Sequence, residues 1–140
     1  MLIGIDDYSA SQFDAGAVTV APRDWPNLYG AVNDVDAMRE MLVARHGFAD
    51  RDILVLKNHR ATRAAILGAI EQHLATGDVA LFYYAGHGSQ VPNSRSTEPD
   101  KLDESLVPAD SRAGAPDIRD KELRRLFNRI LDRGARLTLI

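Results

Sequence analysis

Apolar residues along the chain fall either into short continuous runs or into longer segments with helical spacing. The continuous runs are Leu2–Ile5, Ile53–Leu56, Val79–Tyr84 and Leu137–Ile140. Each is short enough for a β-strand. The run at 79–84 has no polar alternation, which is typical of a strand covered on both faces. These runs predict a mostly parallel sheet buried between helices.

Three segments between these runs carry apolar residues at three- and four-residue steps, which is the spacing of one helix face. Their predicted bounds are Leu28–Gly47, Thr62–Gly77, and from Asp117 or Asp120 to Gly134. Thr62 can cap the second helix, and the glycines are typical helix ends. The apolar face of the third helix is expected to contain Leu123, Leu126, Phe127, Ile130 and Leu131.

Two polar connections, residues 6–27 and 86–116, are rich in Gly, Pro, Ser, Asn or Asp. We expect both to be long irregular loops, and the second to be functional. The alternation of strands and helices predicts right-handed βαβ units in an α/β sandwich. Chemistry in such sheets collects beyond the carboxyl ends of the strands. His87 follows the third predicted strand, so it lies where a site is expected.

Composition narrows the classes of function. A chain of 140 residues fits one domain, and its net charge of -3 gives no global attraction to nucleic acid or anionic lipid. No run approaches the ~20 apolar residues of a membrane span. The first strand runs into Asp6 and Asp7, unlike a signal peptide, so we expect a cytoplasmic protein. The absence of cysteine excludes disulfides, Cys-ligated zinc and a thiol nucleophile within these residues.

His87 stands between Gly86 and Gly88 directly after the third predicted strand. The glycines leave the backbone free for a sharp turn and keep the imidazole unshielded, and their N–H groups could face an oxyanion. An anchored imidazole at a strand end suits acid–base catalysis, although a structural or merely exposed histidine remains an alternative. A nucleotide-binding protein could use a similar turn, but the chain lacks both G-x-x-x-x-G-K-[ST] and G-x-G-x-x-G. The remaining histidines show no metal-ligand spacing and are expected at the surface: His46, His59 and His73.

Five blocks, in order along nearly the whole chain, carry a resemblance to a known family. They are Leu2–Asp6 followed by Tyr8, Leu28–Asp34 with Met38, Ala80–Gln90, Asp103–Asp110 and Ile118–Leu123. The block around His87 resembles the catalytic-histidine block of metacaspases, which are caspase-like cysteine peptidases. The resemblance implies a three-layer αβα caspase-like sandwich with a mostly parallel sheet. Residues 1–140 would then be one p20-type domain, incomplete at its C-terminus.

The family also implies a cysteine–histidine dyad. His87 matches the histidine, and the cysteine should follow Ile140 by a few residues, because its motif comes directly after the fourth strand. This fragment alone is therefore expected to be inactive, and its first partner would be the remaining C-terminal portion of the same domain. The alternative is a non-catalytic caspase-fold scaffold or regulator.

The resemblance further implies cleavage of proteins or peptides after Arg or Lys, with Asp34 as one acidic group of the specificity pocket. A carboxylate facing a guanidinium forms a charge-assisted, bidentate pair. The family often has Cys at the position of Ala31 and Ser at that of Ala85, but neither difference removes the charge. The alternative is that Asp34 only caps or decorates its helix.

The acidic loop Glu98–Glu104 and the later Asp120 resemble a region that binds activating calcium in many metacaspases. Asp103 and Asp120 match ligand positions, whereas Lys121 stands where a second adjacent Asp is usual. No cofactor is required by the expected chemistry, and calcium is the candidate metal. The alternative is a solvated loop with Asp120 as a helix N-cap.

Overall fold

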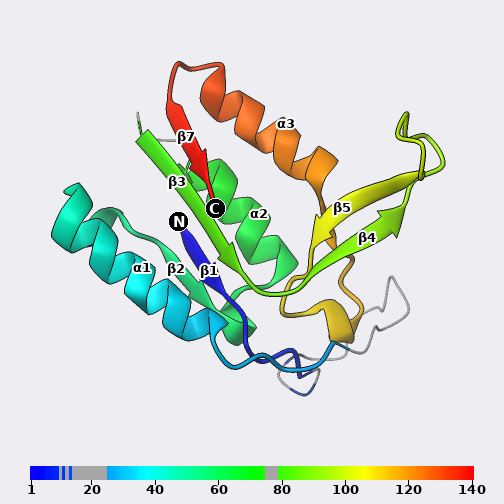
Figure 1. The fold of residues 1–140 in the computed structure, drawn as a ribbon, viewed down its shortest axis with the longest axis horizontal. Coiled ribbons are helices and arrows are strands. Elements are labelled where there is room, and N and C mark those ends of the chain that lie inside the picture. Colours follow the sequence, from blue (N-terminus) through cyan, green and yellow to red (C-terminus); the bar gives the residue numbers. More distant parts are fainter. Residues whose placement is uncertain (10, 12, 14–24, 75–78) are drawn as a thin grey trace.

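The computed structural model of the protein describes residues 1–9, 11, 13, 25–74 and 79–140 (Figure 1). A four-stranded sheet with the order β2-β1-β3-β7 lies at its centre. Its strands are β1 (Leu2–Gly4), β2 (Val55–Lys57), β3 (Val79–Ala85) and β7 (Arg136–Leu139). Each neighbouring pair is parallel. The predicted parallel sheet is confirmed.

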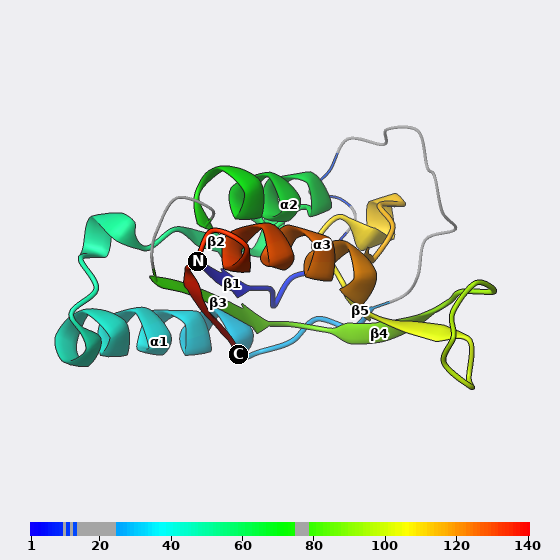
Figure 2. The same ribbon diagram turned by 90° about the horizontal axis from the view of Figure 1, so that it is seen from above.

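Helices cover both faces of this sheet. α1 (Ala31–His46) packs on one face, and α2 (Arg63–Gln72) and α3 (Asp120–Leu131) pack on the other, as Figure 2 shows. The larger apolar core lies on the side of α2 and α3 and includes Ile66, Phe82 and Ile130. The smaller core lies under α1. The predicted three-layer αβα sandwich is therefore confirmed.

The start of α1 is fixed by the residue that follows β1. The Asp6 carboxylate accepts hydrogen bonds from the backbone N–H groups of Gly30, Ala31 and Val32, at 3.0, 2.8 and 3.2 Å. These N–H groups have no partner inside a helix, and a carboxylate also interacts favourably with the helix dipole. Since Asp6 lies just beyond the C-terminal end of β1, the N-terminus of α1 is held at that edge of the sheet.

The observed element bounds refine the predicted ones. The second strand is displaced toward the C-terminus, to Val55–Lys57. Thr62 caps α2 as expected, with its Oγ1 accepting from the Ala65 N–H at 3.1 Å, and Gly77 lies outside the described residues. The third helix starts at Asp120, one of the two predicted starts, so that prediction is confirmed. Its N-cap is Arg119, so the alternative of Asp120 as the N-cap is wrong. Leu131 is 48% exposed, so it does not belong to the buried face of α3.

The prediction of an irregular loop over residues 86–116 is wrong. This region contains a hairpin, β4 (Gly88–Pro92) and β5 (Leu102–Leu106), which pairs with β6 (Ile118–Arg119) in a second, antiparallel sheet. The hairpin projects away from the main sheet (Figure 1). Exposed and partly buried residues alternate along β4, so its polar composition looked like a loop although its backbone is paired.

The described structure also contains short 3-10 turns, among them η2 (Asp50–Asp52), η3 (Asn58–Arg60) and η5 (Ser111–Ala113). Most of the predicted connection at 6–27 lies outside the described residues. Within the part of the chain that the structure describes, no helix has both the length and the apolar character needed to cross a membrane.

Candidate active site

The last two strands of the parallel sheet bring Ile140 close to the segment that carries His87. β3 and β7 run side by side and end at the same edge (Figure 1). The Tyr84 N–H donates to the Ile140 carbonyl at 3.0 Å, and the Ile140 N–H donates to the Phe82 carbonyl, also at 3.0 Å. Ile140 is thus paired with β3 three residues before His87.

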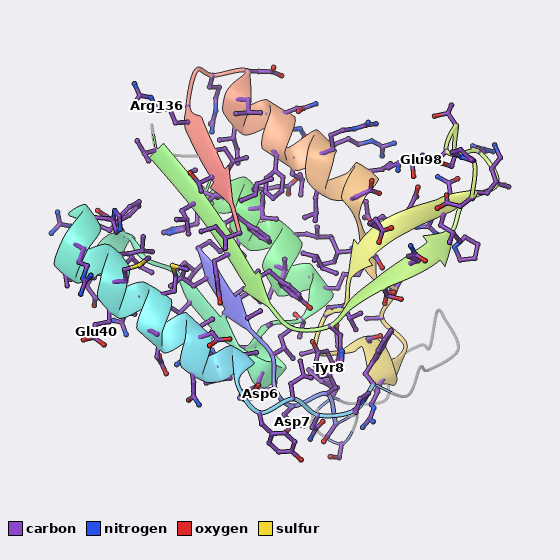
Figure 3. The ribbon with its side chains drawn as sticks, in the orientation of Figure 1. Asp6, Asp7, Tyr8, Glu40, Glu98 and Arg136 are labelled. Atoms are coloured by element: carbon purple, nitrogen blue, oxygen red, sulfur yellow. The ribbon has the colours of Figure 1, made fainter. Side chains whose placement is uncertain are left out.

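The backbone of His87 is held on both sides. Its N–H donates to the Tyr8 hydroxyl at 2.8 Å. Its carbonyl accepts from the Val107 N–H at 3.0 Å and from the Tyr84 hydroxyl at 2.9 Å. Figure 3 shows Tyr8 next to the point where β3 passes into β4. The peptide groups of His87 are therefore fixed by residues from three separate parts of the chain.

The imidazole of His87 is oriented by a carbonyl group. Its Nε2 lies 2.7 Å from the carbonyl oxygen of Pro26. A carbonyl can only accept, so Nε2 carries the proton in this contact and the lone pair of the neutral ring is on Nδ1. The half-buried ring lies 4.9 Å from the ring of Tyr8 and 5.3 Å from that of Trp25, measured between centroids. A base whose second nitrogen is tied to a fixed acceptor is suited to proton transfer through Nδ1.

Gly86 is required for space and not for a left-handed turn. A Cβ at this position would lie 2.6 Å from the Tyr84 hydroxyl oxygen and 2.7 Å from that of Tyr8. At Gly88 the nearest atom to such a Cβ is the Ser105 carbonyl oxygen, at 3.7 Å. Neither glycine has a positive φ, and Gly86 packs closely against the hydroxyl groups of the two tyrosines.

The two tyrosine hydroxyls stay protonated and can donate hydrogen bonds. Burial raises the pKa of Tyr8 and raises that of Tyr84 well above the usual value. Tyr84 directs its proton to the carbonyls of Val107, at 2.7 Å, and His87. Its oxygen lies 3.4 Å from that of Tyr8. Both tyrosines therefore serve to position the His87 turn.

Sequence reasoning missed the residues that surround the imidazole. Tyr8 belonged to a recognised block, but its hydroxyl contact with residue 87 crosses 79 positions of the chain. Trp25 and Pro26 lie in the connection that was expected to be irregular, and no spacing pattern marks them. Trp25 is itself held by a hydrogen bond from its Nε1 to the Ser111 hydroxyl, at 3.1 Å.

Asp34 lies in the first turn of α1, with its side chain exposed. Its charge raises the pKa of Tyr83 on β3, after the larger effect of burial of that phenol. Asp6 provides the side-chain hydrogen bonds at the start of this helix. Asp34 and His87 thus both lie near the edge where the parallel strands end, Asp34 on the side of the sheet that α1 covers.

The predicted calcium ligands lie in a different cluster, between the hairpin and the start of α3. The Asp103 carboxylate is 1% exposed, and hydrogen bonds from Asn93, then Arg119 and Lys121, lower its pKa to about 2. The Lys121 ammonium lies 3.1 Å from Asp103 and 2.9 Å from Asp120. Among the described residues no group of three or more His, Cys, Asp or Glu side chains is arranged to hold a metal. This arrangement, with a cation already in contact with both acids, does not fit calcium.

Comparison with known sequences shows to which family the chain belongs. The sequence model of the metacaspase family, described as "Metacaspase, peptidase C14 domain", matches residues 1–140. The chain belongs to the metacaspase family. The resemblance inferred from the five sequence blocks is confirmed.

Three metacaspases illustrate the similarity. Metacaspase-9 of Arabidopsis thaliana is 35% identical over 131 residues, which are 84% of this chain and 39% of that protein. Metacaspase-1 of Cryptococcus neoformans is 35% identical over 81% of the chain and 26% of its own length. Metacaspase-1A of Aspergillus niger is 36% identical over 81% of the chain and 30% of its own length. The chain therefore spans well under half the length of these relatives.

A solved structure supports the same fold. The crystal structure of a protein from Geobacter sulfurreducens aligns with a TM-score of 0.66 and 25% sequence identity, over 98% of this chain and 46% of that one. The metacaspase domain thus shares its α/β arrangement with a longer experimentally determined chain.

Proposed function

We propose that the protein containing this metacaspase chain is a cysteine endopeptidase in which His87 transfers protons to and from a cysteine encoded beyond Ile140. The observation that carries the proposal is the arrangement of the imidazole. Nε2 is tied to the Pro26 carbonyl and Nδ1 is left as the base, at the sheet edge where Ile140 is paired with Tyr84. A chain that continues from Ile140 leaves the sheet beside this base.

The chemistry assigned to the site is acyl transfer. Nδ1 of His87 takes the proton of the cysteine thiol, and the thiolate attacks the carbonyl carbon of the scissile peptide bond. The imidazolium then gives its proton to the departing amine, and water hydrolyses the thioester with the imidazole again acting as base. The N–H of His87 is donated to Tyr8, so the N–H groups of Gly86 and Gly88 remain the candidates for contact with the oxyanion.

Cleavage after Arg or Lys is the specificity that best suits an acidic group at this edge. Asp34 is exposed and carries a negative charge near Tyr83, while Asp6 provides the capping of α1. Its carboxylate can therefore pair with a basic side chain of a bound peptide. The proposed substrates are proteins or peptides with a basic residue before the cleaved bond. A cytoplasmic location stays a prediction.

The proposal is tested by replacing His87 with Ala in the complete protein. We expect kcat/KM for Arg- and Lys-terminated reporter peptides to fall by on the order of 10³-fold or more, because the group that is proposed to take the thiol proton is removed. His59→Ala is the matched control, since His59 is exposed on η3 and should leave turnover unchanged.

Two outcomes count against the proposal. Activity that persists in a folded His87→Ala variant would remove His87 from the reaction. A folded wild-type protein that cleaves no peptide would favour the alternative of a non-catalytic caspase-fold scaffold.

A further inference from the structure

One lysine side chain draws together acidic residues from three parts of the chain. The Lys121 Nζ lies 2.8 Å from Glu98 Oε1, 3.1 Å from Asp103 Oδ1 and 2.9 Å from Asp120 Oδ2. Glu98 lies at the tip of the hairpin (Figure 3), Asp103 is on β5, and Asp120 opens α3. The ammonium has three protons to donate and finds three carboxylate acceptors.

The oxygens of Asp103 are fully engaged as well. Asn93 Nδ2 donates to both of them at 3.0 Å. Arg119 donates to Oδ2 at 3.0 Å, and Lys121 contacts Oδ1. With a side chain only 1% exposed, Asp103 is a buried carboxylate whose charge is compensated by two basic residues of this chain. A buried charge is tolerated only with such partners.

We infer that the Lys121 ammonium takes the place of a divalent metal ion. It occupies the space that such an ion would need among Glu98, Asp103 and Asp120. Its ion pairs connect the β4–β5 hairpin to α3 without a metal. Calcium requires six to eight oxygen ligands at about 2.3–2.6 Å, and here the oxygens face an ammonium at hydrogen-bond distances. A positive charge covalently attached to the cluster also repels a second cation. Calcium is therefore excluded while the lysine is present and admitted once it is replaced by a carboxylate.

The anchoring reaches the His87 turn through the hairpin. β4 begins at Gly88, the residue after His87, and β5 leads into Val107, whose N–H donates to the His87 carbonyl. The contact between the hairpin and α3 therefore restricts the movement of β4 and β5, the two strands next to the His87 turn. Calcium binding and unfolding can both be measured without peptidase activity, so their outcome does not depend on the proposed function.

The test uses the complete protein after treatment with EDTA. Calcium binding is measured by isothermal titration calorimetry with calcium chloride, and Tm is measured in EDTA and in about 5 mM calcium. We expect no calcium-dependent change in the wild type. Lys121→Asp should have a Tm lower by roughly 5 °C in EDTA and should recover it in calcium, because a fourth carboxylate then faces the freed oxygens.

Lys57→Asp is the matched control. Among the described residues Lys57 pairs with one acid, Asp36, on the surface, so its replacement should create no calcium site. Lys121→Met removes the positive charge without adding a negative one. This variant replaces Lys121→Asp in the test if Lys121→Asp does not fold in EDTA. This variant should bind calcium more weakly than Lys121→Asp but more tightly than the wild type.

Three results would overturn the inference. The first is calcium binding by the wild type that is lost in Asp103→Asn. The second is the absence of any gain in calcium binding in both Lys121 variants. The third is an equal gain in Lys57→Asp.

Discussion

Tyr8 and Tyr84 bring their hydroxyl groups to the backbone on either side of His87, one accepting from its N–H and the other donating to its carbonyl. Burial keeps both phenols protonated by raising their pKa. At the scale of single residues, the turn that carries the imidazole is thus held by the hydrogen bonds of two tyrosine side chains. Gly86 leaves the room that these hydroxyls occupy.

Replacing Gly86 with Ala should displace one or both tyrosines, because the added Cβ would lie within 2.7 Å of their hydroxyl oxygens. We expect a loss of about 1–3 kcal/mol in unfolding free energy, as for other overpacked sites, and a clear fall in peptide turnover. Urea unfolding and kcat/KM of the complete protein measure the two effects. Gly88→Ala, with its nearest atom at 3.7 Å, should leave the unfolding free energy close to that of the wild type. Equal stability of all three proteins would refute the packing argument.

Asp34 and Asp36 offer a second comparison at this scale, since both are exposed acids near the start of α1. Asp34→Asn should lower kcat/KM for Arg- and Lys-terminated peptides by roughly 30-fold or more, the effect of losing about 2 kcal/mol of charge pairing. Asp36→Asn should have little effect, because Asp36 pairs with Lys57 instead. The unfolding midpoints of both variants provide the stability control. Unchanged turnover by Asp34→Asn would remove Asp34 from the pocket.

The elements with a strong apolar period were the ones that the sequence predicted well. Val35 and Leu42 are buried on α1, Ile66 and Ile70 on α2, as the helical spacing required. The β4–β5 hairpin was missed because a polar, half-exposed strand pair has no apolar period, and its order comes from backbone pairing across ten or more residues. The spacing of apolar residues along the chain indicates which side chains are buried. It does not indicate which backbone segments, distant in the sequence, pair with each other.

The contact between α1 and β1 gives a prediction for whole elements. At Gly4 a Cβ would lie 2.6 Å from the Ala31 carbonyl oxygen and 2.8 Å from Val35 Cγ2, so a side chain there would push the helix off the sheet. Gly4→Ala should cost about 2–3 kcal/mol, at the upper end for overpacking because one of the contacts is backbone. Gly68→Ala, inside α2 with nothing within 4 Å of its Cβ, should instead stabilise the protein by about 0.5–1 kcal/mol. Urea unfolding of both variants measures these changes in free energy. An unfolding free energy of Gly4→Ala equal to that of the wild type would be evidence against this close approach.

For the whole molecule, the parallel sheet determines where chemistry can gather. Because β1, β3 and β7 end at one edge, Asp6, His87 and Ile140 are brought to it from distant parts of the chain. This much follows from the order of elements, so the position of His87 could be predicted from the sequence. The Pro26 carbonyl that orients the imidazole could not, because any residue supplies a carbonyl and only the folded path of the chain places one 2.7 Å from Nε2.

Alkylation of the complete protein by iodoacetamide at about pH 6, followed by mass spectrometry of the modified peptides, tests whether the His87 imidazole activates a cysteine thiol. A thiol beside the His87 imidazole is held as a thiolate and reacts faster than an ordinary cysteine. We expect a cysteine within a few residues of Ile140 to be alkylated on the order of tenfold faster in the wild type than in His87→Ala. Equal rates in the two proteins, or no cysteine at that place in the wild type, would rule out His87 as the base of a cysteine peptidase.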